Sequence, residues 1–79
     1  MTVKVRLFAT LRRYRPGLGL GESLTVELPA GATVADLIAH LGLPPKEVKF
    51  AYVNHIVRRP EHPLADGDDV GLFPPVGGG

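Results

Sequence analysis

The sequence predicts an α+β domain in which one helix covers one face of a small mixed sheet. Several short segments alternate apolar and polar residues, a pattern typical of half-buried strands. One segment between them repeats its apolar residues at helical spacing. The chain has 79 residues, which allows one domain with room for one sheet and one helix.

The first strand is predicted over residues 2–9. Its inward positions are all aliphatic: Val3, Val5 and Leu7. Phe8 falls on the opposite face, away from the expected core. A second alternating segment over residues 23–28, with Leu24, Val26 and Leu28 inward, is predicted to pair antiparallel with the first.

The segment between these two strands predicts a loop. Residues 17–21 contain three glycines, which is too many for a regular element, so we expect a mobile loop with at most one helical turn before Pro16. Arg12, Arg13 and Arg15 precede the glycines. A solvated basic loop is the favoured interpretation of these arginines, and contact with RNA or an acidic partner is the alternative.

A helix is predicted to begin after Thr33 and to end before Gly42. Its apolar residues are spaced for one stripe: Val34, Leu37, Ile38 and Leu41. Thr33 and Asp36, three residues later, predict a shortened capping box. Gly42 suits the position after the last turn, and Pro44 and Pro45 prevent continuation.

Three more strands are predicted after the helix, over residues 50–53, 56–58 and 69–73. The register of the first of these stays open, because both of its alternating sets are apolar. Asn54 and His55 predict a tight turn into the second.

The connection from residue 60 to residue 69 is polar, and Leu64 is its expected apolar anchor. In the last strand, Val70 and Leu72 are expected to face inward and Phe73 outward.

The order of these elements fits the β-grasp, or ubiquitin-like roll. That fold has a mixed sheet of four to five strands with one helix on one face, and its first and last strands lie side by side in the middle. We expect residues 1–75 to form this domain and residues 76–79 to form a flexible glycine-rich tail.

Charge and composition exclude several kinds of function. Nine basic and eight acidic residues give a net charge of +1, which argues against strong attraction to nucleic acid or to an anionic membrane. The absence of cysteine excludes disulfides, thiolate metal sites and a cysteine nucleophile. The three histidines lack metal-ligand spacing, so no metal site is expected. No apolar run is long enough to span a bilayer, and we expect a cytoplasmic protein.

The last strand is followed by two prolines, a valine and three glycines: Pro74, Pro75, Val76, Gly77, Gly78 and Gly79. A segment without side chains is either a disordered remnant or a thread that enters a narrow site. Residues 76–79 extend at most about 13 Å, which is enough to reach a buried site while the domain stays outside.

Five motifs, in this order, resemble the MoaD/ThiS family of ubiquitin-like sulfur carriers: Val5–Ala9, Thr33–Leu37, Val53–Asn54, His62–Asp68 and Phe73–Gly79. The resemblance implies that an E1-like adenylyltransferase, using ATP and magnesium, adenylates the carboxylate of Gly79. A sulfurtransferase then supplies the sulfur of a thiocarboxylate, and Gly78 completes the required glycine pair. The chain itself would be a substrate and partner of enzymes, would bind no cofactor, and would not be an enzyme.

The Phe73–Pro75 segment and the long first loop resemble the small subunit of molybdopterin synthase, whose large subunit would accept the sulfur. The ending Val76–Gly79 is closer to the thiamine-pathway carrier. Delivery of sulfur to the molybdenum or tungsten cofactor is the favoured interpretation. Thiamine synthesis, tRNA thiolation and conjugation to other proteins through Gly79 remain alternatives, as does an interaction module with an inert tail.

The alternation of the strands adds a prediction of its own. Phe8 and Phe73 both face outward, and in a β-grasp their strands are neighbours, so the two rings should form an exposed apolar patch beside the tail. We expect these rings to bind a partner, together with the segment that follows them: Pro74, Pro75, Val76 and Gly77. The alternative is that the rings pack into the core through a bulge.

Overall fold

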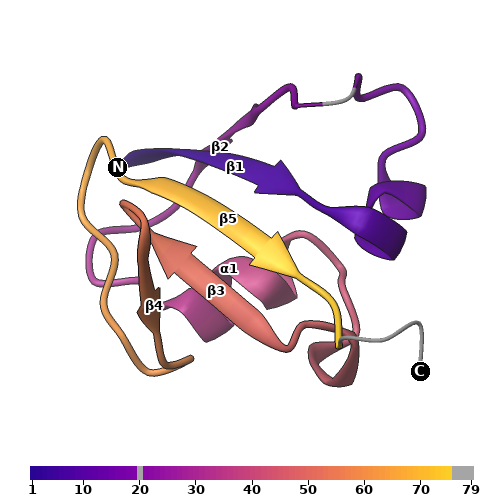
Figure 1. The fold of residues 1–79 in the computed structure, drawn as a ribbon. Coiled ribbons are helices and arrows are strands. Elements are labelled where there is room, and N and C mark those ends of the chain that lie inside the picture. The colour runs from indigo at the N-terminus through magenta and orange to yellow at the C-terminus, as the bar shows by residue number, and fades with distance from the viewer. Residues whose placement is uncertain (20, 76–79) are drawn as a thin grey trace.

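The predicted β-grasp is confirmed in the computed structural model, which describes residues 1–19 and 21–75. In this part of the chain, five strands form one mixed sheet and one α-helix lies against one of its faces (Figure 1). The elements are, in chain order, β1 (Thr2–Leu7), the 3₁₀ helix η1 (Ala9–Tyr14), β2 (Leu24–Glu27), α1 (Val34–His40), the 3₁₀ helix η2 (Pro45–Glu47), β3 (Phe50–Val53), β4 (Ile56–Arg58) and β5 (Asp69–Phe73).

The strand order is β2-β1-β5-β3-β4, so the first and last strands lie side by side as predicted. They run parallel, with Lys4 opposite Asp69 and Leu7 opposite Leu72. The other pairs, including the predicted pairing of β1 with β2, are antiparallel. Because β5 is the middle strand, the residues that follow Phe73 leave from the centre of one end of the sheet (Figure 1).

The core between sheet and helix is made of aliphatic side chains. The inward sets predicted for β1 and β5 are buried, and Leu64 is 5% exposed beneath the connection that it anchors. The predicted second strand is slightly shorter than expected, and Leu24 at its start is only half-buried. Partial exposure follows from the position of β2 at the edge of the sheet.

Strand β3 has the register that the sequence left open. Ala51 and Val53 face the core, at 6% and 4% exposure, and Phe50 and Tyr52 face away from it. Hydrogen-bonded pairing sets this choice, because Val53 lies opposite the buried Val70 of β5. Asn54 and His55 then form the predicted tight turn, with φ of 52° and 71°.

The predicted capping box begins α1. The Thr33 hydroxyl accepts from the Asp36 amide at 3.2 Å, and the Asp36 carboxylate accepts from the Thr33 amide at 2.9 Å. The next two amides, of Val34 and Ala35, donate to carbonyls of the connection between β4 and β5. Gly42 has φ of 73° and ends the helix as expected.

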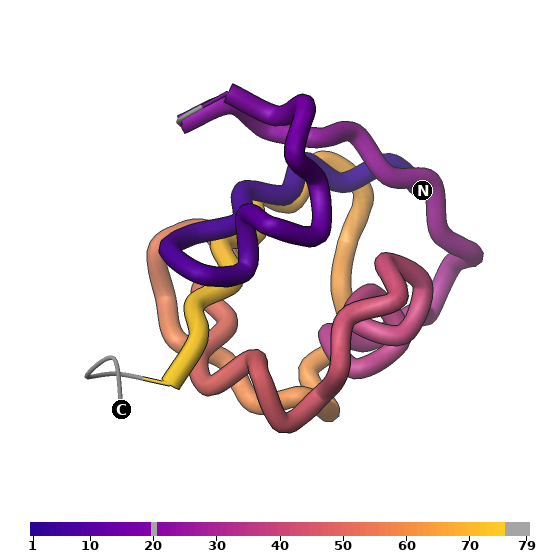
Figure 2. The backbone as a smooth tube through the Cα atoms, turned by 90° about the vertical axis from the view of Figure 1, so that its right-hand side faces the viewer, coloured from indigo at the N-terminus to yellow at the C-terminus, as the bar shows by residue number. Residues whose placement is uncertain are grey.

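The helical turn predicted before Pro16 is present as η1, and it begins where β1 was expected to continue. Ala9 has φ of 52° and turns the chain out of the sheet, so β1 ends at Leu7 rather than at residue 9. Leu11 is fully buried and anchors η1 to the core. Figure 2, which faces the end of the sheet where β1 and β5 finish, shows η1 beside the end of β5.

Two arginines of the predicted solvated basic loop also make polar contacts within the domain, and the Arg13 side chain is 61% exposed. Arg13 forms a 2.7 Å ion pair with Glu47, and Arg15 donates to the carbonyl of Leu41 at 3.0 Å. These bonds connect η1 to η2 and to the end of α1 across more than twenty residues of sequence. The segment before the glycines is therefore braced by its arginines.

Candidate functional site

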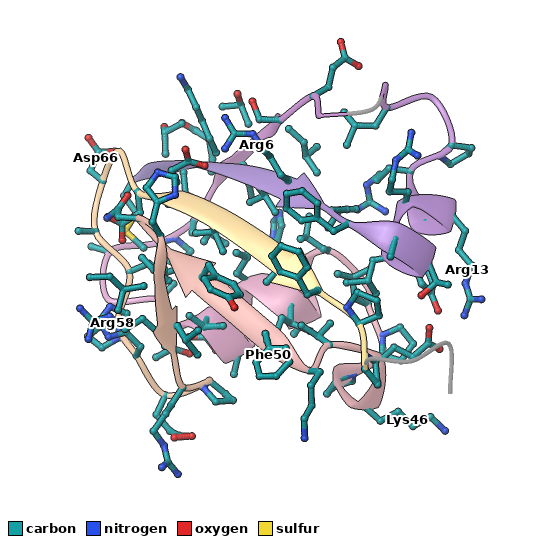
Figure 3. The ribbon with its side chains drawn as sticks, viewed as in Figure 1. Arg6, Arg13, Lys46, Phe50, Arg58 and Asp66 are labelled. Carbon is teal, nitrogen blue, oxygen red and sulfur yellow. The ribbon has the colours of Figure 1, made fainter. Side chains whose placement is uncertain are left out.

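The face of the sheet opposite α1 carries a cluster of four aromatic side chains, which we call the outer cluster: Phe8, Phe50, Tyr52 and Phe73. The rings of Phe8 and Phe73 are stacked, with centroids 4.2 Å apart and planes 1° apart. Tyr52 meets Phe73 edge-on at 5.2 Å, and Phe50 lies 6.5 Å from Tyr52. In Figure 3 this face is toward the viewer, with the labelled Phe50 in front of β3.

Backbone hydrogen bonds fix the outer cluster at the end of β5. The Phe8 amide donates to the Leu72 carbonyl at 3.1 Å, which continues the β1–β5 pairing one residue past β1. The Lys49 amide donates to the Phe73 carbonyl at 2.8 Å on the other side. Phe50 pairs with Phe73 across the strands. Three aromatic residues from three chain segments thus form one row at the end from which the tail departs.

The predicted outward placement of Phe8 and Phe73 is confirmed, and the alternative of core packing is wrong. Both rings are half-buried, because each covers one face of the other, so the patch is less exposed than the sequence suggested. Phe50 adds a 36% exposed ring, and Val57 of β4, opposite Tyr52, is 50% exposed. The apolar surface therefore extends from Phe8 across the sheet toward β4.

Gly71 lies beneath these rings in the middle of β5. An added Cβ there would lie 3.2 Å from Cε2 of Phe8 and 3.5 Å from Cε1 of Phe73, closer than the Phe8 ring would tolerate without moving. Its cross-strand partners are Arg6 and Tyr52. The missing side chain contributes to a hollow of about 310 Å³, whose lining comes from three strands, the turn after β3 and the residue that follows β1: Arg6, Phe8, Tyr52, His55, Asp69, Gly71 and Phe73.

Charged groups border the hollow on the side away from the tail. Nη1 of Arg6 donates to both carboxylate oxygens of Asp69 at 3.0 Å. Lys4 is the cross-strand neighbour of Asp69 in the β1–β5 pairing. The Asp69 amide donates to the Asn54 side chain at 3.0 Å, and the amide group of Asn54 donates to Asp68. The turn after β3 therefore holds the start of β5 in place.

A second polar cluster joins η1 to η2 near the same end of the molecule. One oxygen of Glu47 accepts from Arg13 at 2.7 Å and from the Tyr14 hydroxyl at 2.9 Å. The hydrogen bond with Tyr14, followed by the charge of Glu47, raises the pKa of Arg13 above its ordinary value. Arg13 is thus a permanent cation, and it lies at the right of Figure 3, as does Lys46.

The predicted partner-binding segment is only partly within the described residues. Pro74 is half-buried and Pro75 is exposed directly after β5. Val76, Gly77, Gly78 and Gly79 lie outside the described residues, so their predicted roles stay predictions. The two prolines lack amide donors, and they therefore end the pairing of β5 with its neighbours.

Within residues 1–19 and 21–75, no helix has the length and apolar character needed to cross a membrane. Across the same residues, no three His, Asp or Glu side chains gather as a metal site would require. The outer cluster and the neighbouring ion pair present exposed aromatic area and charge on one face of the sheet.

The sequence matches the ThiS family over residues 5–79. The chain belongs to this family. The resemblance to the MoaD/ThiS sulfur carriers is thereby confirmed, and the fold is the ubiquitin-like β-grasp of its structural neighbours. Comparison with curated protein sequences found no match.

Three solved structures are similar to this ThiS-family chain. A molybdopterin converting factor, subunit 1, from Pyrococcus furiosus is 35% identical over 95% of this chain and 98% of its own, with a TM-score of 0.73. SAMP1 from Haloferax volcanii is 26% identical over the full length of both chains, also with a TM-score of 0.73. A chain from the complex of subunits 1 and 2 of the Helicobacter pylori molybdopterin-converting factor is 28% identical over the full length of both, with a TM-score of 0.62.

Proposed function

We propose that this ThiS-family chain is a sulfur carrier whose Gly79 carboxylate is adenylated and then converted to a thiocarboxylate. The sulfur is delivered to molybdopterin synthesis. The chain acts in the cytoplasm as a substrate and subunit of enzymes and performs no catalysis itself. The observation that carries the proposal is the outer cluster at the end of β5, directly before the glycine-rich segment of a member of this family.

The choice of pathway is supported by two of the similar structures. The Pyrococcus furiosus relative is a molybdopterin converting factor subunit, and it covers nearly the whole of this chain. The Helicobacter pylori relative occurs in a complex of subunits 1 and 2 of the same factor. We therefore propose a large subunit of that kind as the acceptor, with an E1-like adenylyltransferase and a sulfurtransferase as the earlier partners.

The chemistry follows from the state of the carboxylate. A terminal carboxyl has a pKa of about 3.3–3.7, so it is an anion and a poor electrophile at neutral pH. In the activating enzyme, an oxygen of Gly79 attacks the α-phosphorus of ATP and displaces pyrophosphate. Hydrosulfide then attacks the acyl carbon and displaces AMP, which leaves the thiocarboxylate. ATP and magnesium are bound by the activating enzyme.

The fold would help this chemistry in two ways, by letting the terminal residues enter the partner's active site and by giving the partner a surface to bind. Gly77 and Gly78 have no side chains to obstruct a narrow channel, and Pro74 and Pro75 direct the segment away from the sheet. The outer cluster gives the partner an apolar surface next to that segment. Docking there holds the domain while the carboxyl carbon is brought within about 3–3.5 Å of its reaction partner.

Intact mass spectrometry tests the proposal. The purified chain is incubated with the adenylyltransferase of its own organism, ATP, magnesium and sulfide. Replacement of one oxygen by sulfur raises the mass by about 16 Da. A chain without Gly79 is the control and should show no gain.

Recovery of the chain from its host distinguishes the alternatives. Thiocarboxylate on a free chain, absent from cells that lack the adenylyltransferase and retained in cells that lack the molybdopterin synthase large subunit, is the expected result. A ladder of heavier conjugates would instead identify a protein modifier. A chain that never gains sulfur or adenylate would overturn the carrier function.

A further inference from the structure

We propose that the hollow over Gly71 receives an aliphatic side chain of the protein partner, and that a carboxylate next to that side chain binds Arg6. This inference rests on the proposed function, because it assumes that the outer cluster docks on the activating enzyme or the large subunit. It adds the chemistry of the partner's contact segment. It also gives Gly71 a role beyond making room for the rings of Phe8 and Phe73.

Gly71 is unexpected where it stands. A glycine in the interior of a central strand weakens the strand, and it often marks a point where another group approaches closely. A Cβ at this position would crowd Phe8 and contact Phe73. Any side chain here would also take up part of the hollow that Gly71 lines. The glycine therefore keeps this part of the hollow open.

The size and shape of the hollow favour a side chain over a small-molecule cofactor. Its volume of about 310 Å³ is at the bottom of the range of about 300–1,000 Å³ for pockets that enclose small ligands. It is a depression on a sheet face, so it covers its occupant from one side only. A single protruding side chain, carried by a larger surface that covers the rest, matches this form.

The walls select an apolar occupant. Phe8 and Phe73 form one wall, and Tyr52, held edge-on to Phe73, forms another. Aromatic faces also attract cations, which makes a lysine or arginine the competing occupant. The local charge does not favour a cation, because the charged residues that line the hollow, Arg6 and Asp69, already form an ion pair with each other. The lining therefore has no unpaired carboxylate for a cation to bind.

The ion pair of Arg6 and Asp69 also explains why we expect a carboxylate on the partner. Arg6 holds Asp69 through Nη1 alone, and among the described residues its Nη2 and Nε have no hydrogen-bond partner. The Arg6 side chain is 38% exposed, so these donors are accessible. Asp69 holds the Arg6 guanidinium in place through one nitrogen and leaves the other N–H donors of Arg6 for a further hydrogen bond. A partner carboxylate can then bind a positioned group, which makes such bonds strong and directional.

Two substitutions with matched controls test the inference by calorimetry against the adenylyltransferase and the large subunit of the chain's own organism. Gly71→Ala fills the hollow, and Gly17→Ala makes the same change at a position where an added Cβ meets nothing within 4 Å. Arg6→Gln removes the free donors. Arg59→Gln removes a cation that is likewise paired with a carboxylate, Glu61, but lies outside the hollow.

We expect Gly71→Ala and Arg6→Gln to weaken binding at least tenfold to one of these partners, and both controls to bind as the unchanged chain does. Thermal melting keeps folding separate from docking, because all four variants should melt cooperatively. The difference in affinity between the unchanged chain and Arg6→Gln should also become smaller as the salt concentration is raised, because salt screens the charge of Arg6.

If Gly71→Ala and Gly17→Ala bind both partners with equal affinity, the proposal that a partner side chain occupies the hollow is wrong. Equal losses from Arg6→Gln and Arg59→Gln would overturn the carboxylate contact. Either result can occur while the unchanged chain still gains about 16 Da of sulfur, so the carrier function would stand. A chain that binds and reacts with neither partner overturns the carrier function, and this inference with it.

Discussion

The two faces of the sheet differ in the kind of apolar residue that they use. The face toward α1 is packed with Val, Leu, Ile and Ala, and the buried core contains no aromatic residue among those described. The opposite face carries Phe8, Phe50, Tyr52 and Phe73. Aromatic rings ordinarily supply much of the buried area in small cores. Their placement on the open face of this chain separates the aliphatic core from the surface that we propose for recognition.

The division has a cost in stability. Full burial of a phenylalanine contributes about 1.5–3 kcal/mol, and rings on the outer face gain only part of this. Stacking of Phe8 on Phe73 recovers some of the lost contact, since aromatic pairs contribute about 0.5–1.5 kcal/mol beyond burial. The area that remains uncovered is available to a partner. Substitutions on the two faces should therefore affect different properties.

The largest effect is expected on the inner face. Leu37 of α1 is fully buried, so Leu37→Ala should lower the free energy of unfolding by about 2–5 kcal/mol through the cavity that it leaves. Urea denaturation measures this loss. The variant that remains folded at low temperature should bind the adenylyltransferase with unchanged affinity. A folded variant with weaker binding would contradict the separation of the two faces.

An intermediate effect, on binding instead of stability, is expected on the outer face. Phe73→Ala and Phe8→Ala should each weaken partner binding about tenfold or more, or about 1.4 kcal/mol, and leave a cooperative melt. Calorimetry with the adenylyltransferase measures the affinity. Because the two rings stack, the double variant should lose less than the sum of the single losses.

Ile56→Ala is the control for these variants, because Ile56 is an exposed apolar residue that pairs with the inward-facing Val53, so it lies on the other face of the sheet and outside the hollow. It should leave the affinity nearly unchanged. Full affinity in Phe73→Ala, or the loss of its cooperative melt, would show that the ring serves the fold.

The smallest effect is expected from the cluster that joins η1 to η2. The pKa of Arg13 is raised, so its contribution to stability is present below its unfolded pKa and is lost only as the pH rises through the higher folded value. That range is far above neutrality. Glu47→Gln should therefore shift the melting temperature slightly, and by the same amount at about pH 6 and about pH 9. If the shift in melting temperature caused by Glu47→Gln differs between these two pH values, another group titrates together with this cluster.

Much of the fold could be predicted from the sequence, because its signals are local. The alternation of β1 and β5, the capping box at Thr33 and the turn at Asn54 each depend on residues within a few positions of one another. The register of β3 could not be predicted, since the rule that large apolar residues face inward fails there. Ala51 faces the core, and Tyr52 faces outward into the cluster.

Part of the site could also be predicted, because the alternation of residues along a strand is a local signal. The outward placement of Phe8 and Phe73 follows from alternation alone, and the structure adds Phe50 and Tyr52. The bracing of η1 could not be predicted, because Arg13 and Glu47 are 34 residues apart in the sequence. Gly71 gave a usable signal, since a glycine inside a strand calls for an explanation. The sequence could not show that a side chain at this position would crowd Phe8, which follows β1 and is 63 residues earlier in the chain.

The central pairing of β1 with β5 also bears on how the protein is made. β1 is synthesised first, but its central pairing with β5 can form only after β5 has been synthesised. Phe8 is synthesised early, but it has no ring to stack on until Phe73 has emerged and β5 has inserted between β1 and β3. A chain that ends before Phe73 therefore lacks the stacked rings of the outer cluster. A partner that binds this cluster, as proposed above, would bind only chains in which β5 is present.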